Sequence, residues 1–171
     1  MIEIVAERVS LRSPTLEDVE ALAALTEDDP ASFASPGADG RERLRSQIER
    51  HPTLDDGGFL QLVVESDGRL IGDIQARAPE HGFPPGVCEI GITLAPDVRG
   101  RGLGLEAVGL FTTYLLEQGS ERVQASTAVG NVAMRRVLER AGYTFEGVLR
   151  SYAPAGDGRE DYAMYAVTRS Y

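Results

Sequence analysis

Hydrophobic and polar residues alternate in several short runs of this chain, and such alternation is typical of strands that bury one face. The runs that predict strands are residues 2–11, 59–65, 69–77, 87–94, 122–127, 143–150 and 160–167. Ser66-Asp67-Gly68 supplies turn-forming residues between the second and third runs, so these two strands are expected to form a hairpin.

Apolar residues recur every three or four positions in four other segments, and this spacing predicts helices. The expected helices cover residues 15–25, 41–50, 103–118 and 131–141, with loops at 27–40 and 78–86. Antiparallel strands therefore come first, followed by strand, helix, strand, helix and strand. This order predicts one domain covering residues 1–171, of the α/β (α+β) class, with a mixed, mostly antiparallel central sheet of about seven strands and helices on both faces.

The composition narrows the function classes. The formal net charge of −10 argues against direct binding to nucleic acid, because contact with phosphates needs a basic surface. This charge is compatible with a cationic substrate, and equally with a surface that is acidic for solubility. With one cysteine, Cys88, and two isolated histidines, His51 and His81, neither a disulfide nor a metal site is expected. No apolar run approaches the roughly 18 residues of a membrane span and no signal peptide is recognised, so we expect a cytoplasmic protein without a membrane partner.

The segment Val98-Arg99-Gly100-Arg101-Gly102-Leu103-Gly104 joins an expected strand to an expected helix. Its glycines remove side chains from the turn, so that backbone N–H groups can point at one ligand beside the positive end of the helix dipole. Because two arginines flank the glycines, we interpret the segment as a site for a phosphate-bearing ligand. Two alternatives are a purely structural turn and a dinucleotide site, since Gly102 to Ala107 match G-x-G-x-x-A. The dinucleotide pattern expects an acidic residue about 20 positions further on, and the strand ending near Thr127 has none there.

A longer phrase gives this turn a family context. Glu89-Ile90-Gly91-Ile92-Thr93-Leu94-Ala95-Pro96, followed by Arg99-x-x-Gly102-x-Gly104, resembles the acyl-CoA-binding motif of the GNAT superfamily of N-acetyltransferases. The stretch from Asn131 to Tyr143 is similar to the second motif of that family, an Asn-led helix that ends in Gly-aromatic. The segments that resemble the branch containing ribosomal-protein N-terminal acetyltransferases are Leu11-Arg12-x-x-Thr15-x-x-Asp18, Phe145 to Arg150, and Gly158-Arg159-x-Asp161-Tyr162-x-Met164-Tyr165. The resemblance covers nearly the whole chain.

The resemblance implies an enzyme that transfers an acetyl group from acetyl-CoA to a primary amine by direct attack in a ternary complex. The acceptor is then the α-amine of a protein or a small cationic amine, and the sequence leaves both open. The residues implied for acetyl-CoA are Ile92, Thr93, Leu94, Arg99, Gly100, Arg101, Gly102, Leu103, Gly104 and Asn131. The backbones of Ile92 and Leu94 are expected to offer a strand edge to the amides of pantetheine, and the turn from Arg99 to Gly104 is expected to hold the pyrophosphate.

Glu89 is the candidate general base, because the attacking amine must lose a proton; the alternative is a salt-bridged strand residue. Gly91 shares a strand face with Glu89 and either leaves room for a substrate or marks a bulge. Many family members carry a tyrosine as general acid in the second-motif helix, but Val137-Leu138 stand there. Tyr143 and Tyr152 are then candidates with no other support. A different class of function, a non-catalytic acyl-CoA-binding sensor or scaffold, therefore stays open.

The acceptor is expected between the first two helices, the loop at 27–40 and the last pair of strands. Phe33, Tyr152 and Asp161 are the candidate lining residues there. Asn131 is expected to cap its helix, with or without a contact to the substrates. Met134 and Cys88 are expected at core positions, with Cys88 inert. A free edge strand and the terminal strand pair are compatible with a homodimer.

Overall fold

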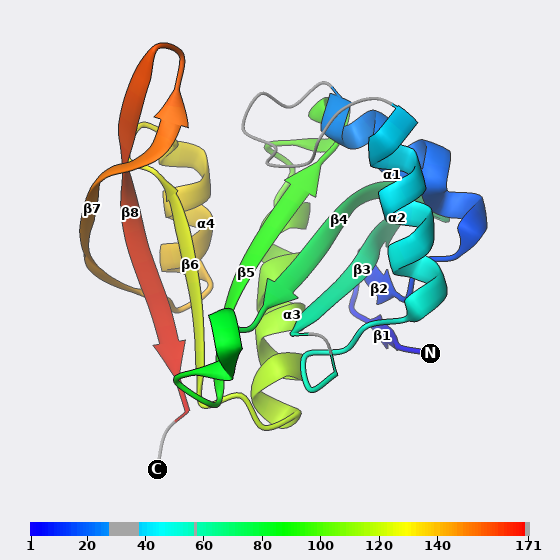
Figure 1. Cartoon of the computed structure of the whole chain (residues 1–171), viewed down its shortest axis with the longest axis horizontal. Helices are drawn as coiled ribbons and strands as arrows, with labels where there is room; N and C mark the ends of the chain where they lie inside the picture. The colour runs from blue at the N-terminus through cyan, green and yellow to red at the C-terminus, as the bar shows by residue number, and fades with distance from the viewer. Residues whose placement is uncertain (28–37, 57, 170–171) are drawn as a thin grey trace.

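The computed structural model describes residues 1–27, 38–56 and 58–169, and its strands form an eight-stranded sheet (Figure 1). The strands are β1 (Glu3–Val5), β2 (Ser10–Arg12), β3 (Phe59–Ser66), β4 (Arg69–Arg77), β5 (Val87–Leu94), β6 (Arg122–Ala128), β7 (Thr144–Ala155) and β8 (Gly158–Thr168). Their spatial order is β1-β2-β3-β4-β5-β6-β8-β7, and β5 and β6 form the parallel pair among antiparallel neighbours. The sheet is therefore not the doubly wound parallel sheet of a dinucleotide fold.

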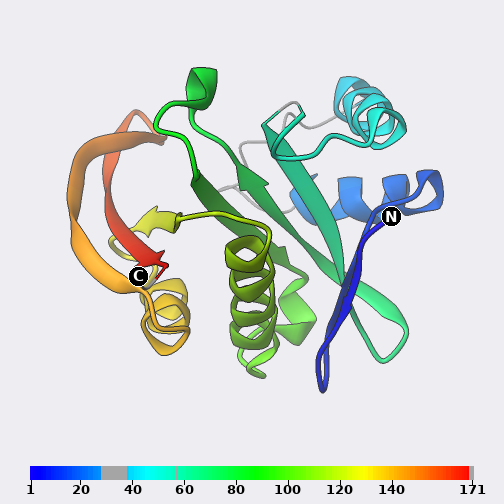
Figure 2. The ribbon, with the colours of Figure 1, turned by 90° about the horizontal axis from the view of Figure 1, so that it is seen from below.

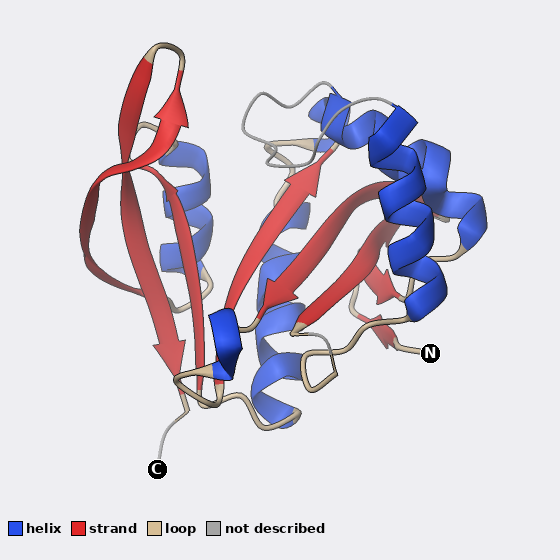
Figure 3. Ribbon diagram, viewed as in Figure 1, coloured by secondary structure: helices blue, strands red, loops and turns tan. Residues whose placement is uncertain are grey.

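Helices cover both faces of the sheet, as the sequence predicts (Figures 2 and 3). They are α1 (Val19–Glu27), α2 (Ala38–Arg50), α3 (Leu103–Glu117) and α4 (Val132–Arg140), with short 3₁₀ helices η1 (Leu16–Asp18), η2 (Glu80–Gly82) and η3 (Pro96–Val98). The larger core lies between the sheet and α3 and includes Leu62, Ile74 and Phe111. A smaller core of Val19, Leu22, Ile48 and Val63 lies under α1 and α2. No helix of the described ranges is long and apolar enough to cross a membrane.

The sheet has eight strands rather than about seven because residues 2–11 form a hairpin and not one strand. β1 and β2 are antiparallel, with Glu3 opposite Arg12, and the Ala6 N–H donates to the Val9 carbonyl across the turn. That turn contains neither glycine nor proline, so the alternation of apolar residues hid it. Three element boundaries also differ from the predicted ones. A 3₁₀ turn precedes α1, and α2 begins at Ala38 rather than at residue 41. The last two strands are longer than predicted and meet at a tight hairpin turn.

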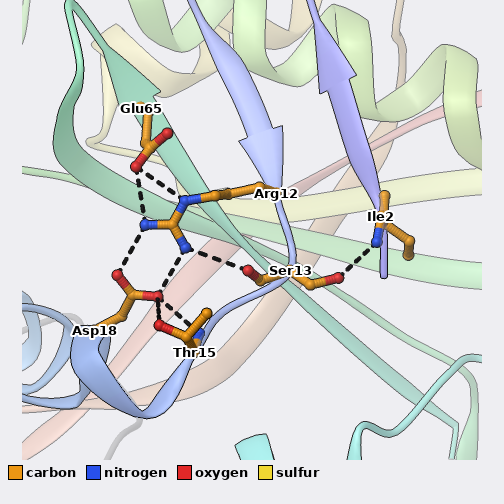
Figure 4. Close-up of polar contacts among 6 residues, drawn as sticks. All are labelled: Ile2, Arg12, Ser13, Thr15, Asp18 and Glu65. Atoms are coloured by element: carbon orange, nitrogen blue, oxygen red, sulfur yellow. Dashed lines mark hydrogen bonds and ion pairs between the residues drawn. The ribbon is translucent and has the colours of Figure 1, made fainter.

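A network of charges around Arg12 joins the hairpin to the first helix and to β3 (Figure 4). The guanidinium donates to both Asp18 carboxylate oxygens, at 2.7 and 2.8 Å, and to Glu65 Oε1 at 2.9 Å. Asp18 also accepts a 2.7 Å bond from the Thr15 N–H. The hydrogen bonds from Arg12 hold the pKa of Asp18 below its ordinary value, against the effect of burial. Arg12 and Asp18, which belong to one of the family motifs in the sequence, therefore hold the start of α1 against β2 and β3.

Candidate active site

The strands β5 and β6 run side by side at one end and separate toward the other (Figure 1). Their parallel ladder contains three pairs, and the last joins Glu89 to Gln124. β5 continues from Ile90 to Leu94 with β4 as its paired neighbour on the opposite side. Within the described residues, the edge of β5 that faces β6 therefore has no strand partner beyond Glu89, which stands where the two strands diverge.

The backbone groups on this open edge belong to Ile92 and Leu94. In an antiparallel ladder, hydrogen-bonded residues alternate along the strand. The Ala95 N–H donates to the Ile71 carbonyl at 2.8 Å, so Thr93 and Gly91, at steps of two, also direct their backbones to β4. Ile92 and Leu94 direct theirs the other way, as the strand-edge hypothesis requires. The backbone of Thr93 lies on the β4 side and its hydroxyl acts on the carboxyl group of Asp73, which stands opposite it. A contact between Thr93 and acetyl-CoA stays a prediction.

The glycine turn lies directly after this open edge. Gly102 adopts φ +83° as the N-terminal cap of α3, a left-handed conformation that L side chains rarely adopt. The first intrahelical bond of α3 runs from the Glu106 N–H to the Gly102 carbonyl, so the N–H groups of Leu103, Gly104 and Leu105 lack acceptors within the helix. A Cβ on Gly104 would lie 3.2 Å from Leu94 Cδ1, so the glycine brings the start of α3 close to the end of β5.

Two arginines extend the turn. Arg99 and Arg101 are both exposed, and Arg99 Nε donates to the Leu94 carbonyl at 2.9 Å. The Arg99 guanidinium therefore lies between the open strand edge and the glycine turn. An extended ligand with amides at one end and phosphates at the other would meet, in order, a strand edge, a guanidinium and the amides of a helix N-terminus.

Hydrogen bonds from β6 hold the Glu89 carboxylate. Ser126 Oγ donates to Oε1 at 2.7 Å and Gln124 Nε2 donates to Oε2 at 3.2 Å. Gln124 is itself held by Arg122 Nε, whose guanidinium also pairs with Glu146. Glu89 has no arginine or lysine partner among the described ion pairs, so the salt-bridge alternative fails. Its carboxylate is partly buried and anchored by two neutral donors at the point of divergence.

Gly91 lies in an unbroken stretch of the β4–β5 ladder opposite Gln75, so the bulge alternative is wrong. A Cβ on Gly91 would lie 3.3 Å from Gln75 Nε2. The absence of a side chain at Gly91 therefore gives the Gln75 amide space on the same face as Glu89. Any acceptor that uses this space shares it with Gln75.

A second carboxylate, Asp73, lies on the same face of the sheet, under α1 and α2. It stands opposite Thr93 and next to Val63 of the smaller core. Its Oδ2 accepts a 2.8 Å bond from Gln61, which in turn accepts a bond from Gln47, while Oδ1 is buried with no partner among the described residues. Burial raises the pKa of Asp73 to about 6, although hydrogen bonding to Gln61 and to Thr93 acts in the opposite direction.

The pH dependence of stability should report this buried carboxyl group. The folded protein holds the Asp73 proton more tightly than the unfolded chain, so raising the pH from about 4 to about 7 removes about 2 kcal/mol of stability. Asp73→Asn cannot titrate and should not lose this increment. Urea unfolding of both proteins from pH 4 to 7 measures it as the change in their difference. Asp67→Asn, at an exposed turn, should track the wild type; parallel curves for Asp73→Asn would contradict the assignment.

The residues of α4, the helix of the second motif, have structural roles as a helix cap and as core side chains. Asn131 caps α4 by accepting the Met134 N–H at 3.1 Å, and a contact with acetyl-CoA stays a prediction. Met134 packs on the larger core, as expected. Leu138 is fully buried, so the position where the family often carries tyrosine faces the core. No acid replaces it at that position.

Cys88 and Tyr143, two further residues with reactive side-chain groups, both lie in the core. Cys88 is buried on the α3 face, opposite Glu89, and burial raises the pKa of its thiol. The Tyr143 hydroxyl is buried and bonded to Thr112 Oγ1 at 2.7 Å. Burial also raises the pKa of Tyr143, so it stays a neutral core group.

The β7–β8 hairpin carries two of the three residues predicted for the acceptor. Tyr152 lies in an irregular part of β7 between Leu149 and Ala153, and the centroid of its ring lies 5.3 Å from the centroid of the Tyr162 ring. Asp161 accepts the Ser151 N–H at 2.7 Å and so shapes this irregularity. Strand alternation places Tyr162, and not Asp161, on the face of Glu89. Phe33 lies outside the described residues.

Several residues of this face were missed by the sequence analysis. Gln124 and Ser126 alternate with apolar residues in β6, and that pattern marks a polar face but not its partner. Asp73 is an anomaly in an otherwise apolar strand that the sequence alone reveals, whereas only a family motif marks Tyr162. The pairing of β5 with β6, on which the Glu89 contacts depend, joins segments 35 residues apart.

An open strand edge that leads to the free amides of a helix N-terminus, with a carboxylate where the edge begins, is the arrangement expected for an acyl-CoA-dependent transferase. A family model described as an acetyltransferase (GNAT) domain matches residues 8–144. The chain therefore belongs to the GNAT family of acetyltransferases, uses acetyl-CoA and is an acyl-CoA-dependent acetyltransferase.

Individual proteins agree with this assignment. A probable N-acetyltransferase of Bacillus subtilis, YjcK, is 25% identical over 94% of this chain and 86% of its own length. A solved structure of a probable acetyltransferase is 25% identical, with a TM-score of 0.83 over 99% of this chain and 98% of that one. RimL, a ribosomal L7/L12 α-N-protein acetyltransferase solved with coenzyme A, is 20% identical, with a TM-score of 0.79 over 98% of each chain. The last likeness shows the fold alone.

Proposed function

We propose that this enzyme transfers the acetyl group of acetyl-CoA to a primary amine by direct attack within a ternary complex. The observation that carries the proposal is the end of the β5–β6 ladder at Glu89 and Gln124. That ending leaves a strand edge without a neighbouring strand, which supports the proposal that pantetheine binds there with the Glu89 carboxylate near the thioester. A linear arm bound along Ile92 and Leu94 directs its phosphates to the turn from Arg99 to Gly104.

Glu89 is the proposed general base. The ammonium form of the acceptor loses a proton to the carboxylate, directly or through water, and the neutral amine then attacks the thioester carbonyl carbon. The C–N bond forms, the C–S bond breaks, and the sulfur of CoA leaves with the electron pair as a thiolate. The nitrogen then loses its second proton, which passes directly or through water to the thiolate, so the products are the amide and the CoA thiol, and Glu89 returns its proton to solvent. The bonds from Ser126 and Gln124 leave lone pairs on both Glu89 oxygens for the amine proton. With Leu138 in the core, positioning of the two substrates carries the rest of the catalysis.

The proposed acceptor lies over the face shared by Glu89 and Gln75, beside the β7–β8 hairpin. Tyr152, whose ring is tilted by 46° against the ring of Tyr162, supplies an aromatic surface that suits an apolar or cationic group. Asp161 contributes by holding the Ser151 backbone, with Phe33 proposed to complete the surface. The acceptor is a protein α-amine or a small cationic amine. The proposal includes a cytoplasmic location and a homodimer that pairs through an edge strand.

Two-substrate kinetics test the proposal. Purified enzyme, acetyl-CoA and three kinds of amine (a peptide with a free N-terminus, the same peptide N-terminally acetylated, and a linear polyamine) are assayed for release of the CoA thiol and for acetylated product by mass. We expect saturable turnover with at least one free amine, none with the blocked peptide, and intersecting double-reciprocal lines. Parallel lines, which indicate an acyl-enzyme, or no acetylated amine would contradict it.

A further inference from the structure

The turn between β1 and β2 reaches across the molecule to the glycine turn through one residue, Arg8. Its backbone N–H donates to Glu106 Oε1 at 2.7 Å, and its Nε donates to Glu106 Oε2 at 2.9 Å. Its Nη1 donates to the Arg101 carbonyl at 3.0 Å. These bonds fasten the N-terminal hairpin to both sides of the N-terminal cap of α3, over a sequence separation of more than 90 residues.

The guanidinium of Arg8 also lies against Gly102. A Cβ on Gly102 would stand 3.3 Å from Arg8 Nη2, so the arginine occupies the side of the turn that the missing side chain leaves open. The orphan N–H groups of α3 start at the next residue. Arg8 is therefore the third arginine at this turn, after Arg99 and Arg101, and it comes from a part of the chain that the phosphate motif does not include.

Glu106 gives this contact an electrostatic consequence. Its carboxylate belongs to the first turn of α3, where an unpaired negative charge would repel a phosphate bound at the same helix end. Burial alone would raise the pKa of Glu106, but the bonds from Arg8 lower it below the ordinary value, so the carboxylate stays charged and paired. Arg8 thus neutralises a charge that the cofactor would otherwise face.

We propose that Arg8 is a positioning residue for the phosphate-binding turn: by holding the Arg101 carbonyl and the Glu106 carboxylate, it keeps the N-terminal amides of α3 directed at the pyrophosphate of acetyl-CoA. The inference rests on the proposed function, which places the pyrophosphate at residues 99–104. It extends the cofactor site to the N-terminal hairpin, so changes in that hairpin alter the affinity for acetyl-CoA without touching the acceptor.

The test compares two acyl donors, acetyl-CoA and S-acetylpantetheine, which carries the thioester arm without the phosphates of CoA. Arg8→Ala should raise the Kd and KM for acetyl-CoA about tenfold, because charge-assisted bonds to the turn are lost, while kcat and the KM for S-acetylpantetheine stay unchanged. Arg8→Lys keeps the charge but loses the planar fork, so its Kd should fall between those of the wild type and Arg8→Ala. Arg169→Ala is the matched control, since Arg169 pairs with Glu121 and is 49% exposed, as Arg8 is.

Each outcome decides between the inference and the proposed function. An acetyl-CoA Kd within twofold of the wild type in Arg8→Ala, or equal losses for both donors, overturns the role of Arg8. If Arg8→Ala does not fold, Arg8→Lys and Arg8→Gln carry the same comparison, and unchanged acetyl-CoA affinity in both overturns it. Gly102→Glu separates the two hypotheses: if it too leaves the affinity intact, the placement of the pyrophosphate fails, whereas if it alone abolishes binding, only the role of Arg8 fails.

Discussion

Replacing Gly102 with glutamate is expected to weaken acetyl-CoA binding at least about a hundredfold, or about 3 kcal/mol. Gly102 caps α3 at φ +83°, and the amides of Leu103, Gly104 and Leu105 follow it. A side chain at this φ costs about 1–2 kcal/mol of backbone strain. The new carboxylate also lies at the positive end of the helix, where it repels the pyrophosphate and competes for the same amides. Calorimetric titration with acetyl-CoA and with CoA measures the loss.

Gly119 provides the matched control for this change. It has φ +102° just beyond the other end of α3, and nothing lies within 4 Å of a Cβ placed there. Gly119→Glu therefore adds the same charge at a similarly strained backbone, and it should bind acetyl-CoA like the wild type. Gly102→Ala, which adds the strain without the charge, should fall between the two glutamate variants. Tight binding by Gly102→Glu would remove the glycine turn from the site.

Replacing Glu89 with glutamine is expected to lower kcat about a hundredfold or more while the Kd for acetyl-CoA stays unchanged. The substitution removes the proton acceptor and keeps the size of the side chain. The deficit should shrink as the pH rises toward the pKa of the acceptor amine, because a growing fraction of the amine then needs no base. Measuring kcat from pH 6 to 10 gives the size of the loss and its dependence on pH, and calorimetric titration gives the Kd for acetyl-CoA.

Glu146→Gln is the control for Glu89→Gln. Glu146 belongs to the same chain of polar contacts, through Arg122 and Gln124, but it stands on β7 away from the open edge. It should retain the wild-type kcat. Full activity in Glu89→Gln would show that Glu89 is not the base, and a uniform loss at every pH would indicate a positional role. A non-catalytic sensor would have no turnover for the substitution to reduce.

The parts of the molecule that the sequence predicted best are those set by local patterns. The run from Val87 to Leu94 alternates cleanly and occupies the observed strand, and the glycines after it stand at the start of α3. The β1–β2 hairpin was missed because its turn has no glycine or proline, although it delivers Arg8 to the site. Turn residues with ordinary backbone preferences leave no mark on an alternating pattern.

The contacts that define the site depend on pairing between distant strands, which no local pattern encodes. Glu89 was named from its family motif, yet its partners, Ser126 and Gln124, follow from a parallel register that stops after three pairs. The edge of β5 is open because the β5–β6 ladder has no fourth pair after Glu89 and Gln124. Asp161 was named as an acceptor residue, but strand alternation places Tyr162 on the face of Glu89 instead. Side-chain direction in β8 depends on a ladder that the sequence does not specify.

Hydrogen exchange at the amides of β5 tests the central claim most directly, because the claim is that acetyl-CoA completes the open strand edge. Exchange is followed by NMR in the free protein and with saturating CoA. The Ile92 and Leu94 amides should become at least about tenfold more protected on binding, because each faces the open edge and gains a partner. The Gly91 and Thr93 amides, which already face β4, are internal controls and should change little. Binding of CoA without added protection at Ile92 and Leu94 would contradict the account.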